Sequence, residues 1–203
     1  MVVPINDKQV KVAVEIVKKG GLIIYPTETV YGLGCDPYNK KAVKKVFEVK
    51  GRTAKPLPLL VSSLKKALDL AFFPKPALKI AKKYWPGPLT LVLKRKKKAP
   101  EFLGGDPSLI GLRVSKHPVA SQIVRLCGGT LVGTSANLSG NKPSTTAQEA
   151  AKQLGNKVDL ILDGGKTFFG VSSTVLDFST EEPKILRVGP ISKDEILSFI
   201  EEN

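Results

Sequence analysis

The chain has 203 residues, of which 42% are hydrophobic, and this fits one domain of ordinary size that buries its core without disulfide or metal staples. Lysine and arginine total 32 against 18 acidic residues, and the net charge of +14 favours polyanionic partners such as ATP or RNA without choosing between them. No secretory signal and no run of about 18 apolar residues is present, so we expect a cytoplasmic protein without a membrane segment.

The first quarter of the chain predicts two helices around a buried strand. A helix capped by Asn6 or Asp7 ends at the glycine pair 20–21, because apolar residues recur between them at helical spacing. Residues 22–25 form an apolar run typical of a strand. A second helix covers residues 39–50, and its C-terminal end favours a cation there.

Strands and helices continue to alternate along the rest of the chain. Helices begin near Ser62 or Ser63 and at Pro76, and Ser192-x-x-Glu195 is a capping box that opens the last helix. The alternation predicts an α/β fold layered around a central sheet, in a single domain over residues 1–203. The other predicted segments are strands at 57–61, 89–93, 110–114, 130–134, 160–162, 174–178 and 185–188, and a helix at 118–127.

Three features have plain structural interpretations. The basic run 94–98 follows a predicted strand and is expected to be a solvated loop, with contact to tRNA or a partner as the alternative. Cys35 and Cys127 lie far apart, and the chain has one histidine, so neither a zinc site nor a disulfide framework is indicated. That histidine, His117, precedes Pro118 near a helix start, where a structural role is favoured over a general base.

Two polar stretches point to chemistry at phosphorus. Lys50-Gly51-Arg52 closes a predicted helix and supplies fixed positive charge. Ser135-Ala136-Asn137 follows a predicted strand and supplies a hydroxyl and an amide, which suit a nucleotide's phosphate, sugar or base. Gly164-Gly165-Lys166-Thr167 is not a phosphate loop, because Leu160 stands where a Walker motif requires glycine.

Each stretch belongs to a longer signature. The first follows Tyr25-Pro26-Thr27-Glu28-Thr29-Val30-Tyr31-Gly32-Leu33-Gly34, and the second lies within Gly133-Thr134-Ser135-Ala136-Asn137-Leu138-Ser139-Gly140. At these residues the chain resembles the YrdC-like family of L-threonylcarbamoyladenylate synthases, from about Gly20 to Gly189. The resemblance implies a twisted mixed sheet flanked by helices, with a basic concave cleft.

The resemblance also implies a reaction. L-threonine, bicarbonate or CO2, and ATP would be joined into L-threonylcarbamoyladenylate with release of pyrophosphate. Lys50 and Arg52 would be catalytic, stabilising charge on phosphate oxygens, and Mg²⁺ would accompany ATP rather than occupy a protein metal site. The product would pass to a separate transferase that modifies a tRNA adenosine, while direct contact with tRNA stays open.

Site residues carry over from the family position by position. The threonine pocket would use Thr27 or Thr29, Arg113 and Ser173, since a guanidinium can hold a carboxylate with two parallel bonds. Leu60 stands where some members have histidine, and Ser115 replaces a common proline. Glu28 is either a salt-bridge partner or a group that positions water. The predicted contacts to ATP or the adenylate are Lys50, Arg52, Ser135, Asn137, Pro143, Ser144 and Arg187.

Alternatives remain at each level. Lys50 and Arg52 can be surface cations at a helix end, and Arg187 can pair with a surface acid. Thr27, Thr29 and Ser135 can be turn residues at strand ends, and Ser173 an ordinary sheet residue. A double-stranded RNA-binding or ribosome-maturation module without catalysis would account for the charge, although only 6% of the chain is aromatic. A carbamoyl-adenylate step in metalloenzyme maturation would be expected to bring acylphosphatase-like and zinc-finger segments, which the sequence does not contain.

Overall fold

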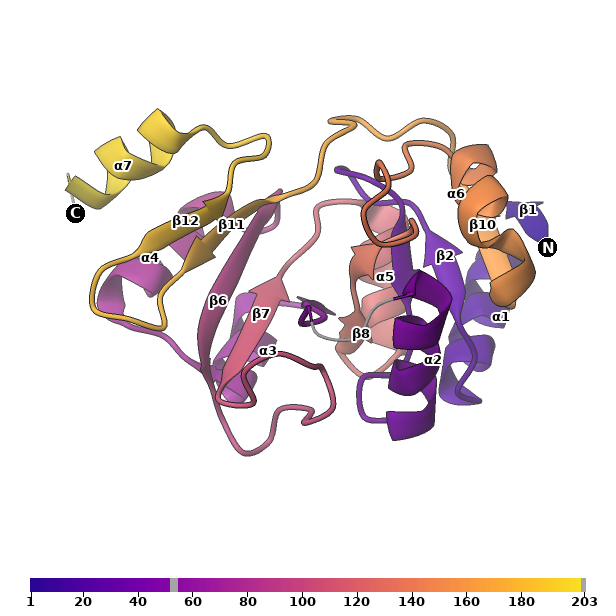
Figure 1. Cartoon of the computed structure of the whole chain (residues 1–203), viewed down its shortest axis with the longest axis horizontal. Helices are drawn as coiled ribbons and strands as arrows, with labels where there is room; N and C mark the ends of the chain where they lie inside the picture. The colour runs from indigo at the N-terminus through magenta and orange to yellow at the C-terminus, as the bar shows by residue number, and fades with distance from the viewer. Residues whose placement is uncertain (52–54, 202–203) are drawn as a thin grey trace.

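The computed structural model describes residues 1–51 and 55–201, and its strands form two sheets that lie side by side (Figure 1). The first sheet is mixed, since β1, β10 and β2 run parallel while β3 is antiparallel to both β2 and β9. Its strands in spatial order are β1 (Val2–Pro4), β10 (Leu160–Asp163), β2 (Ile23–Tyr25), β3 (Gly32–Gly34) and β9 (Thr134–Ser135).

The second sheet is also mixed. The β6 strand runs parallel to β11 and antiparallel to β7, and β5 (Ala71–Phe72) pairs with the far end of β6. The remaining order is β12 (Lys184–Arg187), β11 (Thr174–Asp177), β6 (Leu89–Arg95), β7 (Leu109–Arg113), β4 (Leu59–Val61) and β8 (Thr130–Val132).

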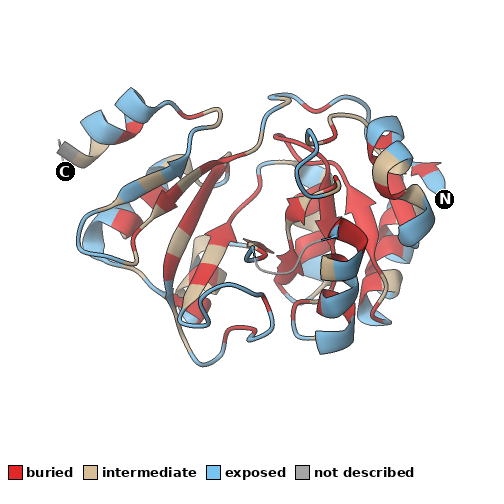
Figure 2. Ribbon diagram, in the orientation of Figure 1, coloured by how far each residue is buried: buried red, intermediate tan, exposed pale blue. Residues whose placement is uncertain are grey.

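Helices cover the outer faces of both sheets, so the strands are largely buried while the helices keep exposed outer faces (Figure 2). In Figure 1, α1, α2, α5 and α6 lie on the side of the first sheet, and α3, α4 and α7 on the side of the second. Their bounds are α1 (Asp7–Lys18), α2 (Lys40–Lys50), α3 (Leu64–Leu70), α4 (Lys75–Tyr84), α5 (Pro118–Leu126), α6 (Ala147–Leu154) and α7 (Lys193–Glu201), with a 3-10 turn at Gly155–Lys157.

The helix starts follow the capping chemistry of the sequence. Asn6 Oδ1 accepts from the backbone N–H of Gln9 at 2.9 Å, and Ser192 Oγ accepts from the N–H of Glu195 at 3.2 Å. Asn39 and Ser63 cap α2 and α3 in the same way. Together, the sheets and helices confirm the predicted mixed α/β fold. The strands divide into two sheets, however, and β1, β3, β5 and α6 were not predicted.

The predicted strand at 130–134 is two strands that belong to different sheets. The β8 strand pairs with β4 in the second sheet, whereas β9 pairs with β3 in the first. The chain crosses at Gly133, where a Cβ atom would lie only 2.8 Å from Cγ of Leu60. A glycine is needed there because the backbone passes so close to a buried side chain.

The basic run 94–98 begins inside β6 rather than in a loop. Arg95 donates from Nη1 to the carbonyl of Ala99 at 3.0 Å and from Nε to that of Pro107 at 2.7 Å. Lys96 Nζ donates to the carbonyl of Leu68 at 2.7 Å. Two of its cations therefore bind the chain's own backbone, and Lys94, Lys97 and Lys98 are exposed.

In residues 1–51 and 55–201, none of the helices combines the length and the apolar character that crossing a bilayer requires. The single-domain boundaries 1–203 and the basic character of the cleft stay predictions.

Candidate active site

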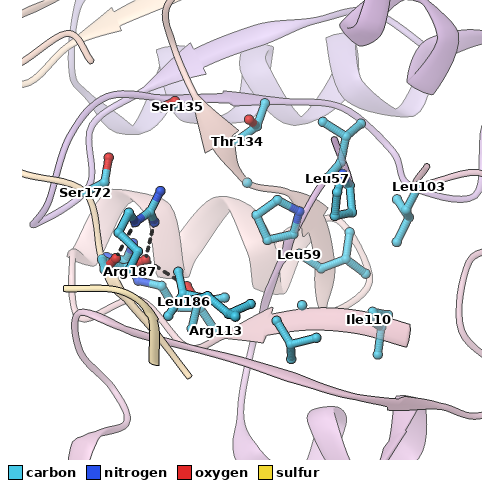
Figure 3. Close-up of a pocket in the computed structure, with 18 of the residues that line it drawn as sticks. Leu57, Leu59, Leu103, Ile110, Arg113, Thr134, Ser135, Ser172, Leu186 and Arg187 are labelled. Carbon is cyan, nitrogen blue, oxygen red and sulfur yellow. Dashed lines mark hydrogen bonds between the residues drawn. The ribbon is translucent and has the colours of Figure 1, made fainter. Parts of the chain in front are cut away.

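A cavity of about 380 Å³ lies between the two sheets (Figure 3). Its apolar end is formed by leucine and isoleucine side chains from β4, β7 and the neighbouring loops, among them Leu57, Leu59, Leu103 and Ile110. The other end carries arginine and hydroxyl groups. Of the predicted site residues, the cavity lining includes Thr29, Arg113, Ser135, Ser173 and Arg187.

Arg113 ends β7 and is held at all three of its nitrogen positions. Nε donates to the carbonyl of Gly87 at 3.1 Å, Nη1 donates to Oγ1 of Thr29 at 2.9 Å, and Nη2 forms an ion pair with Oε1 of Glu28 at 2.8 Å. The side chain lines the cavity although the residue is only 7% exposed. Its guanidinium is thus fixed in orientation before any ligand arrives.

Glu28 is the salt-bridge partner of Arg113. Burial alone would raise the pKa of its carboxyl, but the positive charge of Arg113 and hydrogen bonds from Ser115 and Lys116 lower the pKa to about 2. The Ser115 hydroxyl donates to Oε2 at 2.5 Å, and the backbone N–H of Lys116 donates to Oε1 at 3.0 Å. Glu28 is therefore ionised at neutral pH.

Arg187, in β12, is supported by the backbone and side chain of Ser173. Nε donates to the Ser173 carbonyl at 2.9 Å and Nη2 to its hydroxyl at 3.2 Å, while that hydroxyl also bonds Oγ1 of Thr90 at 2.8 Å. Burial, followed by the nearby charge of Arg113, lowers the pKa of Arg187 from its ordinary value. Among residues 1–51 and 55–201, none of the ion pairs includes Arg187.

The two candidate threonines have different positions. The Thr27 hydroxyl donates to the carbonyl of Val30 at 2.6 Å and accepts from the N–H groups of Thr29 and Val30, which closes the turn after β2. The Thr29 hydroxyl bonds both Thr27 and Arg113 and lies in the cavity lining. Thr29 is consequently the one of the pair that lines the cavity.

Lys50 holds the Ser135 loop together. Lys50 is only 2% exposed, and its Nζ donates to the carbonyls of Ser135 at 2.5 Å and Asn137 at 2.9 Å. The carbonyl of Lys50 in turn accepts from the N–H of Ser139 at 3.0 Å. The helix end and the loop, which are 85 residues apart in sequence, therefore form one hydrogen-bonded unit.

The other predicted nucleotide contacts surround this unit without being part of the cavity lining. Ser144 is fully buried and donates to the carbonyl of Ala136 at 2.7 Å, and Pro143 precedes it, half-buried. Asn137 donates from Nδ2 to the carbonyls of Leu138 and Asn141, while its buried Oδ1 accepts no hydrogen bond from the described residues. Arg52 lies outside the described residues.

Several cavity residues were not predicted. Thr90 supports Ser173, and Ser172, Asp106 and Asp177 add polar groups to the wall. Gly87, which lies outside the lining, supports Arg113 and was not predicted either. Gly87 precedes Pro88, and Thr90 is the second residue of β6, where a polar residue inside the apolar run 89–93 was the available signal. The contact of Gly87 is through its carbonyl, which no side-chain pattern reveals.

Two motifs set aside on sequence grounds have structural roles. His117 is the capping residue before α5, and burial lowers the pKa of its imidazole. The backbone N–H of His117 donates to Oγ of Ser115 at 3.2 Å. In the 164–167 segment, the N–H of Gly164 donates to the Tyr31 hydroxyl at 3.0 Å, and that of Gly165 donates to Oδ1 of Asp163 at 2.9 Å. These amides are already bonded within the protein, unlike those of a phosphate loop.

Sequence comparison and structure comparison find similar proteins of the same kind. The chain is 37% identical to a threonylcarbamoyl-AMP synthase of Pyrococcus abyssi over 98% of this chain and 59% of that protein. A structure of P. abyssi Sua5 complexed with L-threonine matches with a TM-score of 0.93 at 35% identity, covering 100% of this chain and 61% of that one. The structure of E. coli YciO matches with a TM-score of 0.85 at 28% identity, covering 94% and 96%.

The chain thus spans about three fifths of the length of the first two relatives and nearly the whole of the third. A family model named Sua5_yciO_yrdC, described as telomere recombination, matches residues 15–189. The match covers most of the chain and includes both polar stretches and both arginines of the cavity. The chain belongs to the Sua5/YciO/YrdC family.

Proposed function

We propose that this protein forms threonylcarbamoyl-AMP from L-threonine, bicarbonate or CO2, and ATP, with release of pyrophosphate. The observation that carries the proposal is the pair of arginines, Arg113 and Arg187, that stand in one cavity wall beside the hydroxyls of Thr29 and Ser173. Relatives that are 37% and 38% identical to it over about 200 aligned residues are named threonylcarbamoyl-AMP synthases.

The two arginines would bind two anionic groups side by side. Arg113 is buried while Arg187 keeps an exposed surface in the cavity wall, and the charge of Arg113 disfavours the charged form of Arg187, so an anion between them relieves that repulsion. Arg113 would take the amino acid carboxylate, with the Thr29 hydroxyl beside it, and Arg187 an adenylate phosphate oxygen. The bond that joins the substrates would then form between the two arginines.

The apolar end of the cavity suits the adenine ring. Leu57, Leu59, Leu103 and Ile110 offer a surface against which a flat base can pack, at the end away from the arginines (Figure 3). Ser135, Asn137, Pro143 and Ser144 would serve the ribose and phosphates, Ser135 directly from the cavity wall.

The reaction would proceed by displacement at the α-phosphorus. The carbamate oxygen of carboxylated threonine forms a bond to this phosphorus, and the bond to the pyrophosphate oxygen breaks, so that pyrophosphate leaves with the electron pair. Lys50 and Arg52 would be the catalytic cations. The hydrogen bonds of Lys50 to the Ser135 loop support a role in shaping the phosphate cradle as well.

Mg²⁺ would enter with ATP. Phosphate oxygens would hold it, since Asp177 in the cavity wall lies beside Val92 and Gly111, towards the apolar end and away from Arg187. When bound, the ion would neutralise charge on the phosphates.

A single assay tests the proposal. The purified chain, without RNA, should release pyrophosphate only when ATP, Mg²⁺, threonine and bicarbonate are all supplied, and serine should be poorer because a missing methyl group in a shaped pocket is worth about 1–3 kcal/mol. Release that ignores threonine, or that requires RNA, would contradict it. A downstream tRNA-modifying transferase would then consume the product, and direct contact with tRNA is a separate question for the same preparation.

A further inference from the structure

The acid that pairs with Arg113 joins the two sheets. Glu28 lies on the loop between β2 and β3 of the first sheet. All three of the contacts described for its carboxylate come from residues 113–116, at the end of β7 in the second sheet. The Glu28 carbonyl also accepts from the N–H of Phe169 at 2.9 Å. Glu28 is thus fixed by its side chain and its backbone together.

This arrangement leaves part of Arg113 available to a ligand. A guanidinium has five N–H groups, and the contacts to Gly87, Thr29 and Glu28 engage one nitrogen position each. Nη2 lies 2.8 Å from Oε1 of Glu28, but it is buried and forms no aligned hydrogen bond with the described residues, so the ion pair does not use up its donors. The partners of Arg113 therefore set its orientation without exhausting its donors.

Ser115 completes the support of Glu28. Its hydroxyl donates to Oε2, the oxygen that does not pair with Arg113, and it is buried at 3% exposure. Ser115 also accepts from the N–H of His117 at 3.2 Å, which fixes the direction of the hydroxyl. A residue without a side-chain donor could not make this contact to Oε2.

We propose that Glu28, supported by Ser115, is a positioning residue for the amino acid subsite, holding the Arg113 guanidinium in the orientation that receives the substrate carboxylate. The proposal rests on the proposed function. A purely structural ion pair between the sheets is the alternative, and its loss would weaken folding without selecting between the two substrates.

The test is steady-state kinetics with threonine and ATP varied separately. Glu28→Gln should raise the KM for threonine about tenfold or more and change the KM for ATP by less than about threefold, since the acid acts through the group that binds threonine. Added to Arg113→Gln, it should change the threonine KM by less than about twofold, because residues that act through one another are not additive.

Ser115→Ala keeps the test decisive if Glu28→Gln does not fold. It should raise the threonine KM about threefold through the loss of one hydrogen bond to a charged group. The matched control is Ser63→Ala, which removes the cap of α3 at a residue outside the cavity lining and should lower the melting temperature without moving either KM.

The outcomes distinguish a failure of the proposed function from a failure of the positioning role of Glu28. If the wild type releases no threonine-dependent pyrophosphate, both the function and this inference are overturned. If the wild type is active and the variants change both KM values equally, change neither, or combine additively with Arg113→Gln, the function stands and the positioning role is overturned.

Discussion

Two regions of the site use their motif residues in opposite ways: the arginine wall, which contains Arg113 and Arg187, and the Lys50–Ser135 unit, which is the end of α2 with the Ser135 loop. In the wall, Arg113 and Arg187 reach the cavity, and neighbouring hydroxyls and a carboxylate support them from behind. In the unit, Ser135 reaches the cavity, and Lys50 and Asn137 hold the loop that carries it. A short motif can therefore contain both the groups that touch a ligand and the groups that position them.

The largest expected effect is on the wall. Arg113→Ala should raise the threonine KM about 100-fold with a far smaller change for ATP, and should lower stability by about 3–5 kcal/mol, because it leaves the buried charge of Glu28 without its partner. Substrate titrations and denaturant melts measure the two quantities.

Arg125→Ala is the matched control, since this arginine is exposed on α5 and should tolerate the change within about 0.5 kcal/mol. An equal rise in both KM values for Arg113→Ala would move this residue from the amino acid subsite to the nucleotide cradle, and the contrast drawn between the two regions would fail.

The second largest effect on turnover is expected from the Ser135 loop. Lys50→Met keeps the length of the side chain but loses the hydrogen bonds to the carbonyls of Ser135 and Asn137, each worth about 1.5–3 kcal/mol for a charged donor. Turnover should fall about 100-fold, and the melting temperature should fall with it.

A residue that only touched phosphate would lose turnover and keep its stability. Lys50→Met with a wild-type melting temperature would therefore show that the loop does not depend on this lysine. Lys41→Met, on the exposed side of the same helix, is the control and should change neither quantity.

The sequence predicted the members of both regions more reliably than their arrangement. Apolar spacing and caps located the helices, and family motifs located Lys50, Ser135, Arg113 and Arg187. The motifs did not show that Ser144 would be buried behind the loop, because its contact is with a carbonyl that only folding brings near. The alternation of strands likewise did not separate the two sheets, since the crossing at Gly133 depends on local packing against Leu60.

Glu28 shows the same limit. Its position inside the entry motif allowed two roles, and the decision between them required the end of β7, which lies 85 residues further along the chain. Ser115 appeared in the sequence as a departure from the family pattern. In the structure it donates to Glu28, so the departure supplies a contact rather than removing one.

The third effect is a dependence of stability on pH that belongs to the wall. Glu28 has its pKa lowered from 4.5 to about 2 in the folded protein, so the ion pair with Arg113 stabilises the fold above pH 4.5 and this contribution is lost as the pH falls from 4.5 towards 2. Melting temperatures of the wild type and Glu28→Gln should converge across this interval.

Glu15→Gln is the control, because Glu15 pairs with Lys18 on the exposed face of α1 and should follow the wild type at each pH. A difference between the wild type and Glu28→Gln that stays constant from pH 5 to pH 2 would mean that Glu28 does not titrate in this range.

The smallest expected effect concerns the support of the second arginine. Ser173→Ala removes the hydroxyl that bonds both Thr90 and Nη2 of Arg187, but the bond from Nε to the Ser173 carbonyl does not require the side chain. Stability should fall by about 1 kcal/mol, and kcat/KM about fivefold, since Arg187 keeps its backbone contact. Thr180→Ala, in an exposed turn where the hydroxyl bonds the carbonyl of Glu182, is the control and should change kcat/KM by less than twofold, about 0.4 kcal/mol. A loss of 100-fold in Ser173→Ala would show instead that the hydroxyl, which lines the cavity, touches a substrate directly rather than acting through Arg187.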